Sequence, residues 1–237
     1  IDALLARDGA DVLVVKQGRR CESNRTPTPD EARRLFADGH TLLVRHAERQ
    51  DERLAGLAER FRADFHAPVD VHLYATPGGV HGFGWHYDAE DVFILQTQGS
   101  KEYALRKNTV NPWPLVESLP ADMRYERELM PIMKCLLRGG DWLYIPGGHW
   151  HRAEAKEDSI SLAVGVLVPA AMDAFDHLRR RLVDSIYWRQ RLPITGDART
   201  ESEEELIERY RALFAELADD LSRQMRDEAF VRSFLDR

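Results

Sequence analysis

The sequence predicts a mainly β protein with helices, in which a jelly-roll core lies between an N-terminal α/β segment and a C-terminal helical region. Between residues 69 and 169, short runs rich in β-branched and aromatic residues recur, and Pro/Gly turns at 76–79 and 146–148 separate some of them. Several short strands with turn signals of this kind are typical of a jelly-roll barrel. Before and after this segment, apolar residues instead repeat at helical spacing.

The core segment, residues 69–169, is where a small-molecule site is expected. Its predicted strands are 69–75, 92–96, 102–105, 142–145 and 160–168. A jelly-roll barrel can hold a small ligand between its two sheets.

Residues 1–68 form an α/β lead-in, which we expect to pack on the barrel. Residues 12–15 and 41–45 are predicted strands, and Thr28-Pro29 followed by two acidic residues predicts a helix start. A second helix within 50–65 is predicted by the helical spacing of Leu54, Leu57, Ala58, Phe61 and Phe65.

Residues 170–237 form a region of two or three helices. One apolar stripe consists of Met172, Phe175, Leu178, Leu182, Ile186 and Tyr187, and a second consists of Leu206, Ile207, Tyr210, Leu213, Phe214, Leu217 and Leu221. A short bundle buries little apolar surface by itself. We therefore expect these helices to pack on the barrel or on a second copy, and we favour a homodimer through residues 170–237.

The composition excludes several classes of protein. With 43% hydrophobic and 31% charged residues, the 237-residue chain is that of a globular protein without long disorder. No apolar run is long enough to span a bilayer, and charged residues interrupt the first twenty positions, so we expect a cytoplasmic protein without a membrane partner. A net charge of −7 without a basic, aromatic-rich cluster argues against direct nucleic-acid binding and favours a basic protein or peptide partner.

His86, Asp88 and His151 are candidate metal ligands. Residues i and i+2 of a strand point to the same side, so the His86 imidazole and the Asp88 carboxylate can reach one ion. A further imidazole follows the 142–145 strand, where His149 and His151 share a parity, and spacing alone leaves both possible. Two histidines and one carboxylate leave the opposite face of a metal open, as in the non-haem Fe(II) oxygenases, which bind a co-substrate and oxygen there.

Three further polar residues have two interpretations each. Tyr74 and Thr76 alternate onto one face of their strand, where they would offer hydroxyl donors or simply form a cross-strand packing pair. Lys101 is most simply an outward lysine on a strand, because lysine is rarely buried. Inside a barrel its ammonium would be costly unless it met an anion, such as the distal carboxylate of a dicarboxylic co-substrate.

Several motifs between about residues 70 and 167 occur together: Tyr74-Ala75-Thr76-Pro77, Gly82-Phe83, His86-Tyr87-Asp88, Phe93-Ile94-Leu95-Gln96, Gly99, Lys101 and Gly140-Asp141-Trp142-Leu143-Tyr144-Ile145-Pro146. This set resembles the JmjC-type 2-oxoglutarate oxygenases, most closely the ribosomal-oxygenase group, whose members hydroxylate protein side chains. The resemblance implies a double-stranded β-helix of the cupin or JmjC type, with Fe(II), 2-oxoglutarate as co-substrate, and O2. It also implies that the C-terminal helices serve in dimerisation.

The resemblance also assigns individual residues. The last metal ligand in the family lies five residues after the Ile-Pro proline, which selects His151 over His149. The basic residue for the far carboxylate of 2-oxoglutarate lies thirteen after the aspartate, which is Lys101. Ser161 stands where relatives carry a polar residue beside the co-substrate, although a solvent-facing strand serine explains it equally well.

The sequence departs from the family pattern in two places. Gly147 stands where relatives often have proline or a large residue, and Lys101-Glu102-Tyr103 replaces a more usual basic-x-tryptophan. Neither departure changes the expected ligand set.

We therefore predict a 2-oxoglutarate-dependent dioxygenase that hydroxylates a C–H bond in a side chain of a ribosomal or other basic protein, with the three metal ligands as its catalytic residues. One alternative keeps the chemistry but acts on a free amino acid or small peptide. Another is a metal-binding cupin without oxygenase activity that serves as a binding protein. A sugar-binding or isomerase-type cupin would need more histidines at the metal, and His81 has the wrong parity relative to His86.

Overall fold

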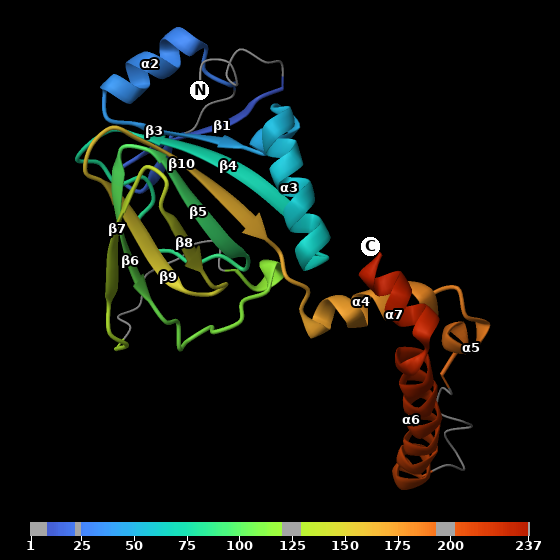
Figure 1. Ribbon diagram of the computed structural model, residues 1–237. Helices are drawn as coiled ribbons and strands as arrows, with labels where there is room; N and C mark the ends of the chain where they lie inside the picture. Colours follow the sequence, from blue (N-terminus) through green and yellow to red (C-terminus); the bar gives the residue numbers. More distant parts are fainter. Residues whose placement is uncertain (1–8, 22–24, 120–128, 193–201, 237) are drawn as a thin grey trace. The chain divides into compact units, whose positions relative to one another are not determined.

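A computed structural model describes residues 9–21, 25–119, 129–192 and 202–236 of the protein, which divides into two compact units. Unit 1 is Ile1–Val168 and unit 2 is Pro169–Arg237. Two β-sheets face each other in unit 1, and the elements described in unit 2 are all helical (Figure 1). The predicted mainly β class with a C-terminal helical region is confirmed.

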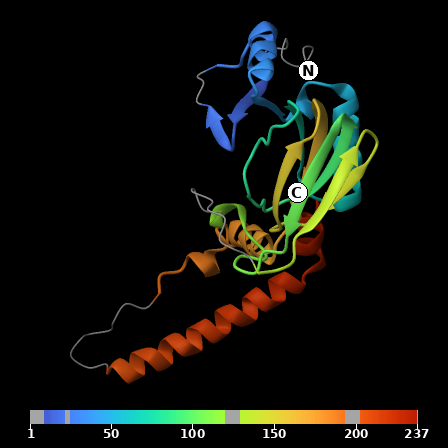
Figure 2. The same ribbon diagram turned by 90° about the vertical axis from the view of Figure 1, so that its left-hand side faces the viewer.

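The described part of unit 1 contains a large and a small antiparallel sheet (Figure 2). The large sheet has the strand order β2-β1-β3-β4-β10-β5-β8, and the small sheet has the order β7-β6-β9. The strands are β1 Asp11–Lys16, β2 Arg19–Cys21, β3 Thr41–Arg45, β4 Val69–Thr76, β5 Asp91–Gln98, β6 Ser100–Arg106, β7 Met133–Arg138, β8 Trp142–Ile145, β9 Trp150–Ala155 and β10 Ser159–Val166.

The helices of unit 1 begin where the sequence carries capping residues. Helix α2 (Pro29–Ala37) starts with a capping box, in which the Thr28 hydroxyl accepts from the Glu31 N–H and the Glu31 carboxylate accepts from the Thr28 N–H. Helix α3 (Glu52–Phe65) starts at Asp51, whose carboxylate accepts two backbone N–H groups. Two short 3-10 helices, η1 (Ala47–Arg49) and η2 (Val116–Ser118), complete the described helical elements of this unit.

One face of the large sheet packs on α3, and the other lines the interior between the sheets. Alternate residues of β4 and β10 point to α3, where Ala58 is fully buried against Val71 and Val164. The intervening residues point inward, and the register places Tyr74 opposite Ser161. Alternation therefore directs apolar side chains to the helix and leaves polar ones for the interior.

Two details of the strand assignment differ from the sequence-based expectation. Strands β2, β7 and β9 were not predicted. Strand β9 carries Arg152 and Glu154 on its outward face and so lacks an apolar run. His86 and Asp88 were expected on a strand, but they lie in the connection between β4 and β5. Within that connection His86 forms a single bridge with His151, and no longer ladder develops around it.

Unit 2 is held together by a small apolar cluster. Its described helices are α4 Ala171–Leu182, α5 Ile186–Arg189, α6 Glu203–Arg226 and α7 Glu228–Leu235. Leu178, Leu182 and Phe230 are buried together, and the Trp188 indole donates a 2.7 Å hydrogen bond to Asp220. Only part of the first predicted stripe is buried, since Ile186 is 79% exposed. Among the helices described, none combines the length and the apolar character that crossing a bilayer requires.

Candidate metal centre

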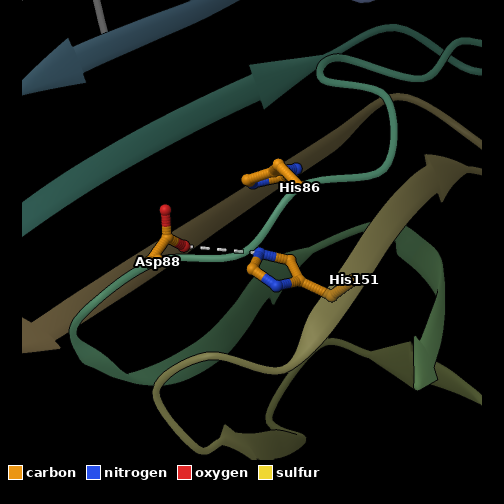
Figure 3. Close-up of side chains that lie close together, drawn as sticks. All are labelled: His86, Asp88 and His151. Carbon is orange, nitrogen blue, oxygen red and sulfur yellow. Dashed lines mark ion pairs between the residues drawn. The ribbon is translucent and has the colours of Figure 1, made fainter. Parts of the chain in front are cut away.

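His86, Asp88 and His151 converge on one point between the sheets. Their potential ligand atoms lie within 4.8 Å of one another (Figure 3). His86 and Asp88 come from the β4–β5 connection, and His151 comes from β9 of the small sheet. Two backbone hydrogen bonds join the histidines: the His151 N–H donates to the His86 carbonyl at 2.8 Å, and the His86 N–H donates to the His151 carbonyl at 3.1 Å.

Each imidazole is oriented by a backbone carbonyl. The Nδ1 atom of His86 lies 2.8 Å from the Gly84 carbonyl oxygen, and that of His151 lies 3.0 Å from the His149 carbonyl oxygen. A carbonyl only accepts, so Nδ1 carries a proton in both rings, and in the neutral imidazole Nε2 is the nitrogen that offers a lone pair. Burial, and next the neighbouring His86, hold the pKa of His151 well below its ordinary value. Both features suit a metal ligand, which must be a neutral, oriented imidazole.

Asp88 is positioned by the turn between β8 and β9. Its backbone carbonyl accepts from the Gly148 N–H at 2.7 Å, and its carboxylate Oδ2 lies 3.5 Å from Nε2 of His151. In the same turn, the Gly147 N–H donates to the Asp91 carboxylate at 2.7 Å. A Cβ atom at Gly147 would come within 2.8 Å of the Ala89 carbonyl oxygen. A side chain at this position would therefore collide with the connection between β4 and β5.

Two other histidines do not join this group. His149 immediately precedes β9, in the turn, and its parity with His151 does not bring its side chain to the other ligands. His81 forms an isolated bridge with Glu154 and is exposed. Among the described residues, the group at this point is therefore His86, Asp88 and His151.

The three residues line a cavity of about 390 Å³ between the two sheets. Lys101 lines the same cavity and is only 4% exposed, so the interpretation as an outward strand lysine is wrong. Its ammonium donates to the hydroxyls of Thr76 at 3.2 Å and Ser161 at 3.1 Å, and lies 5.7 Å from the centre of the Tyr74 ring. Lys101 thus contacts the three other polar residues expected near a co-substrate, and Lys101, Tyr74 and Thr76 line one end of the cavity.

The environment of Lys101 is unfavourable for its charge. Burial lowers the pKa of the ammonium from 10.5 to about 8. Its partners are neutral hydroxyls and an aromatic face, and no carboxylate lies in contact with it among the described residues. A buried ammonium with only neutral partners is costly, and an anionic ligand would remove that cost.

The cavity wall contains polar residues that the sequence analysis did not assign to the site, namely Thr41, His72, Glu90 and Tyr103. His72 and Tyr103 could have been found from parity, because each lies two residues from an identified cavity residue on the same strand. The Nδ1 atom of His72 accepts from the His46 N–H at 3.3 Å, which places the proton on Nε2. Burial lowers the pKa of His72, and burial followed by the charges of Asp88 and Asp70 raises that of Glu90 to about 7.

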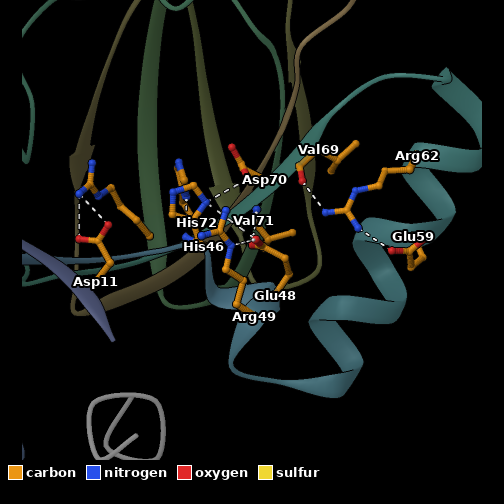
Figure 4. Close-up of polar contacts among 11 residues, drawn as sticks. Asp11, His46, Glu48, Arg49, Glu59, Arg62, Val69, Asp70, Val71 and His72 are labelled. Atoms are coloured by element: carbon orange, nitrogen blue, oxygen red, sulfur yellow. Dashed lines mark hydrogen bonds and ion pairs between the residues drawn. The ribbon is translucent and has the colours of Figure 1, made fainter. Parts of the chain in front are cut away.

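A second cluster of His46, Glu48 and Asp70 has potential ligand atoms within 4.8 Å of one another, but its polar groups already satisfy each other (Figure 4). The His46 Nδ1 atom lies 2.9 Å from the Asp70 carboxylate. The buried Glu48 carboxylate accepts from the Val71 N–H at 2.9 Å and lies 3.5 Å from the Arg49 guanidinium. These contacts tie the 3-10 helix η1 to β4 and hold the strand that carries His72 and Tyr74.

The donor set at His86, Asp88 and His151 fits a divalent transition metal. Two neutral imidazoles and one carboxylate, with an open cavity beside them, match the facial arrangement of non-haem Fe(II) sites. The oriented Nδ1–H groups supply the hydrogen bonds that such ligands need behind the metal.

Comparison with known proteins gives a consistent family assignment. A family model described as "JmjC domain" matches residues 42–174. A bifunctional lysine-specific demethylase and histidyl-hydroxylase NO66 from Dictyostelium discoideum is 30% identical over 131 residues, covering 55% of this chain and 26% of its own length. Ribosomal oxygenase 1 from Gallus gallus is 26% identical over 192 residues, covering 73% of this chain and 30% of its own length. The protein thus spans roughly a quarter to a third of these relatives.

Solved structures show the same fold. The Escherichia coli ribosomal oxygenase YcfD, in complex with cobalt and 2-oxoglutarate, aligns over 98% of this chain and 60% of its own, with a TM-score of 0.62 and 20% identity. A complex of the same protein with cobalt and succinic acid gives a TM-score of 0.61 at 21% identity. At these identities the likeness shows the fold, and the predicted double-stranded β-helix core is confirmed.

We expect Lys101→Met to stabilise the protein when neither metal nor 2-oxoglutarate is present. The folded-state pKa of Lys101 lies below the unfolded value, so at pH 7 the folded state carries a penalty for the charge that the unfolded state does not. Removing the charge should raise the free energy of unfolding by about 2–3 kcal/mol. Urea denaturation with a chelator measures this.

The same experiment includes a pH arm and a control. The stability of the wild-type protein should rise between pH 8 and 10.5, as the folded state loses its proton first, and this rise should be absent in Lys101→Met. Lys134→Met, at an exposed position on β7, should change stability by less than about 0.5 kcal/mol. A destabilised Lys101→Met would contradict the account of Lys101.

Proposed function

This chain belongs to the JmjC-domain family, and from that premise we propose that it is an Fe(II)- and 2-oxoglutarate-dependent oxygenase that hydroxylates a C–H bond in a side chain of a protein. The observation that carries the proposal is that one cavity is lined both by the metal-binding group, His86, Asp88 and His151, and by Lys101, a buried ammonium without an anionic partner among the described residues. Relatives named for ribosomal oxygenation and histidyl hydroxylation support a protein substrate, such as a ribosomal protein.

Each residue has a definite part in this proposal. His86, Asp88 and His151 hold Fe(II) and leave its cavity side open. Lys101 receives the distal carboxylate of 2-oxoglutarate, with hydroxyl donors from Thr76, Ser161 and Tyr74 beside it. Burial raises the pKa of Tyr74, so its hydroxyl keeps its proton and can donate. Fe(II) with 2-oxoglutarate supplies the oxidising chemistry with O2, which inserts one oxygen atom into the substrate and releases succinate and carbon dioxide.

The protein itself contributes orientation and exclusion of water. The paired backbone hydrogen bonds between His86 and His151 fix the two imidazoles relative to each other. Lys101 and its neighbours fix the co-substrate at one end of the cavity, which leaves the remainder for the substrate side chain. Holding both reactants beside the metal ligands removes much of the entropic cost of bringing them together.

We expect His86→Ala, Asp88→Ala and His151→Ala each to reduce 2-oxoglutarate turnover by at least about 100-fold, because each removes one of three metal ligands. His149→Ala should retain activity within about twofold. Succinate formation by the Fe(II)-loaded protein measures turnover, and calorimetric Mn(II) titration tests the ligand set independently of activity. Full activity in any of the three variants would refute the assigned ligand set.

The affinity for 2-oxoglutarate should depend on the protonation of Lys101. Because the pKa of the free ammonium is about 8, affinity should be constant below that pH and fall by up to about tenfold per unit above it. Calorimetric titration of the Mn(II)-loaded protein measures the profile. Lys101→Arg stays charged throughout and should remove this dependence, whereas a profile unchanged by the substitution would exclude Lys101 as the anchor.

We also propose that unit 2 mediates a homodimer and that the protein acts in the cytoplasm. Ile207 and Phe214 are seven residues apart on α6, so they share a face, and they are 50% and 52% exposed. Exposed apolar side chains on one helix face support an association surface. The net charge of −7 favours a basic segment of the substrate protein.

The dimer is tested by sedimentation equilibrium. The wild-type protein of 27.2 kDa should sediment at about twice that mass, and the double substitution Ile207→Asp/Phe214→Asp should give the monomer. Glu216→Lys, an exposed change on the same helix, should leave the dimer intact. A wild-type monomer at micromolar concentration would rule the proposal out.

A further inference from the structure

Glu90 is an unexplained acid in the cavity that contains the metal-binding group. It lines the cavity two residues beyond Asp88 and is half-buried. Within the described parts of the protein, no hydrogen bond or ion pair reaches its carboxylate. A partly buried carboxylate without a partner is costly, so a functional reason for its position is needed.

The Glu90 carboxylate lies directly on Gly165 of strand β10. A Cβ atom at residue 165 would collide with the carboxylate oxygen Oε2 and come within 3.1 Å of Cδ. The Glu90 side chain is therefore accommodated by the absence of a side chain on the strand beneath it. We call this contact the Gly165 seat; Ala163, the inward neighbour of Gly165 on the same strand, carries a methyl group instead.

The seat lies away from the co-substrate end of the cavity. Ser161 contacts Lys101, and Gly165 lies four residues farther along β10. At about 3.3 Å per residue, the two ends are separated by roughly 13 Å. The negative charge of Glu90 and the positive charge of Lys101 therefore do not neutralise each other, and each end of the cavity is available to a different ligand.

Hydrogen bonds from the turn between β8 and β9 hold the residues on both sides of Glu90. The Gly147 N–H donates to the Asp91 carboxylate, and the Gly148 N–H donates to the Asp88 carbonyl, so the turn between β8 and β9 fixes the residues on both sides of Glu90. Two residues of extended backbone span at most about 7 Å. A group bound by Glu90 is thus held within one side-chain length of the proposed metal.

We propose that Glu90, seated on Gly165, is a specificity-determining residue that binds a positively charged group of the substrate and so selects cationic over neutral side chains. This inference rests on the proposed function, because it assigns the free part of the cavity to the substrate. The neighbouring carboxylates do not serve this purpose: Asp88 belongs to the metal-binding group, Asp70 is paired with His46, and Asp91 accepts from the Gly147 N–H. Glu90 is the carboxylate left to receive a cation.

Three variants test the proposal. Glu90→Gln keeps the shape of the side chain and removes its charge. Gly165→Ala keeps Glu90 but displaces its carboxylate from the seat, at the flexible end of the side chain. Glu102→Gln is the control, because it makes the same change of charge at a residue of β6 that does not line the cavity and that lies 3.7 Å from Lys156.

The probes are two libraries of nine-residue peptides that differ only in a fixed central residue, arginine in one and its neutral analogue citrulline in the other. Binding to the Mn(II)-loaded protein with 2-oxoglutarate is measured without oxygen by fluorescence anisotropy. The wild-type protein and Glu102→Gln should prefer the arginine library by about tenfold or more. Glu90→Gln and Gly165→Ala should each bring this ratio close to one, and the double variant should lower it no further.

The outcomes separate this inference from the proposed function. Binding of 2-oxoglutarate to the Mn(II)-loaded protein depends on Lys101 and should be unchanged in Glu90→Gln. If the wild-type protein binds 2-oxoglutarate but shows no preference for arginine, or if Glu90→Gln keeps the preference, the role of Glu90 is refuted and the oxygenase proposal stands. If the wild-type protein does not bind 2-oxoglutarate at all, the proposed function fails.

Discussion

The pair of backbone hydrogen bonds between His86 and His151 is the interaction on which the site depends. It joins a connection that belongs to the large sheet to strand β9 of the small sheet, and it does so at the residues whose imidazoles converge. A shift of one residue in this pairing would turn one imidazole away from the cavity. The turn between β8 and β9 holds the other side of the same connection through Gly147 and Gly148, which explains why small residues are needed there.

The interior between the sheets contains charged side chains, and burying them lowers the stability of the fold. On the inward face of strand β10, Ser161 contacts Lys101 near one end of the cavity, and Gly165 lies under Glu90 at the other. Neither charge has an ionic partner among the described residues in contact with it. The apolar face that the large sheet buries under α3 is independent of this cavity, so the fold can tolerate the cost.

The two polar clusters of unit 1 show why composition alone does not define a metal site. His46, Glu48 and Asp70 offer donor types similar to those of His86, Asp88 and His151, at a similar separation. In the first cluster the donors are already satisfied by each other and by the backbone. In the second, the Nδ1–H groups are bound behind the rings and the remaining donor atoms face a cavity, which is the condition that a bound ion requires.

The local sequence determined much of the secondary structure and the types of residue in the candidate metal group. Runs of β-branched and aromatic residues located β4, β5 and β10, capping residues located the start of α2, and the types and order of the three donors identified a candidate metal group, because these properties depend on neighbours along the sequence. Tertiary structure decided the rest. Parity states which residues share a face but not which face is inward, so the burial of Lys101 followed from the family resemblance and the fold. The family resemblance, rather than spacing, selected His151 over His149. The loop position of Asp88 and the placement of Glu90 on Gly165 depend on contacts between segments that are distant in sequence, and no local pattern encodes those contacts.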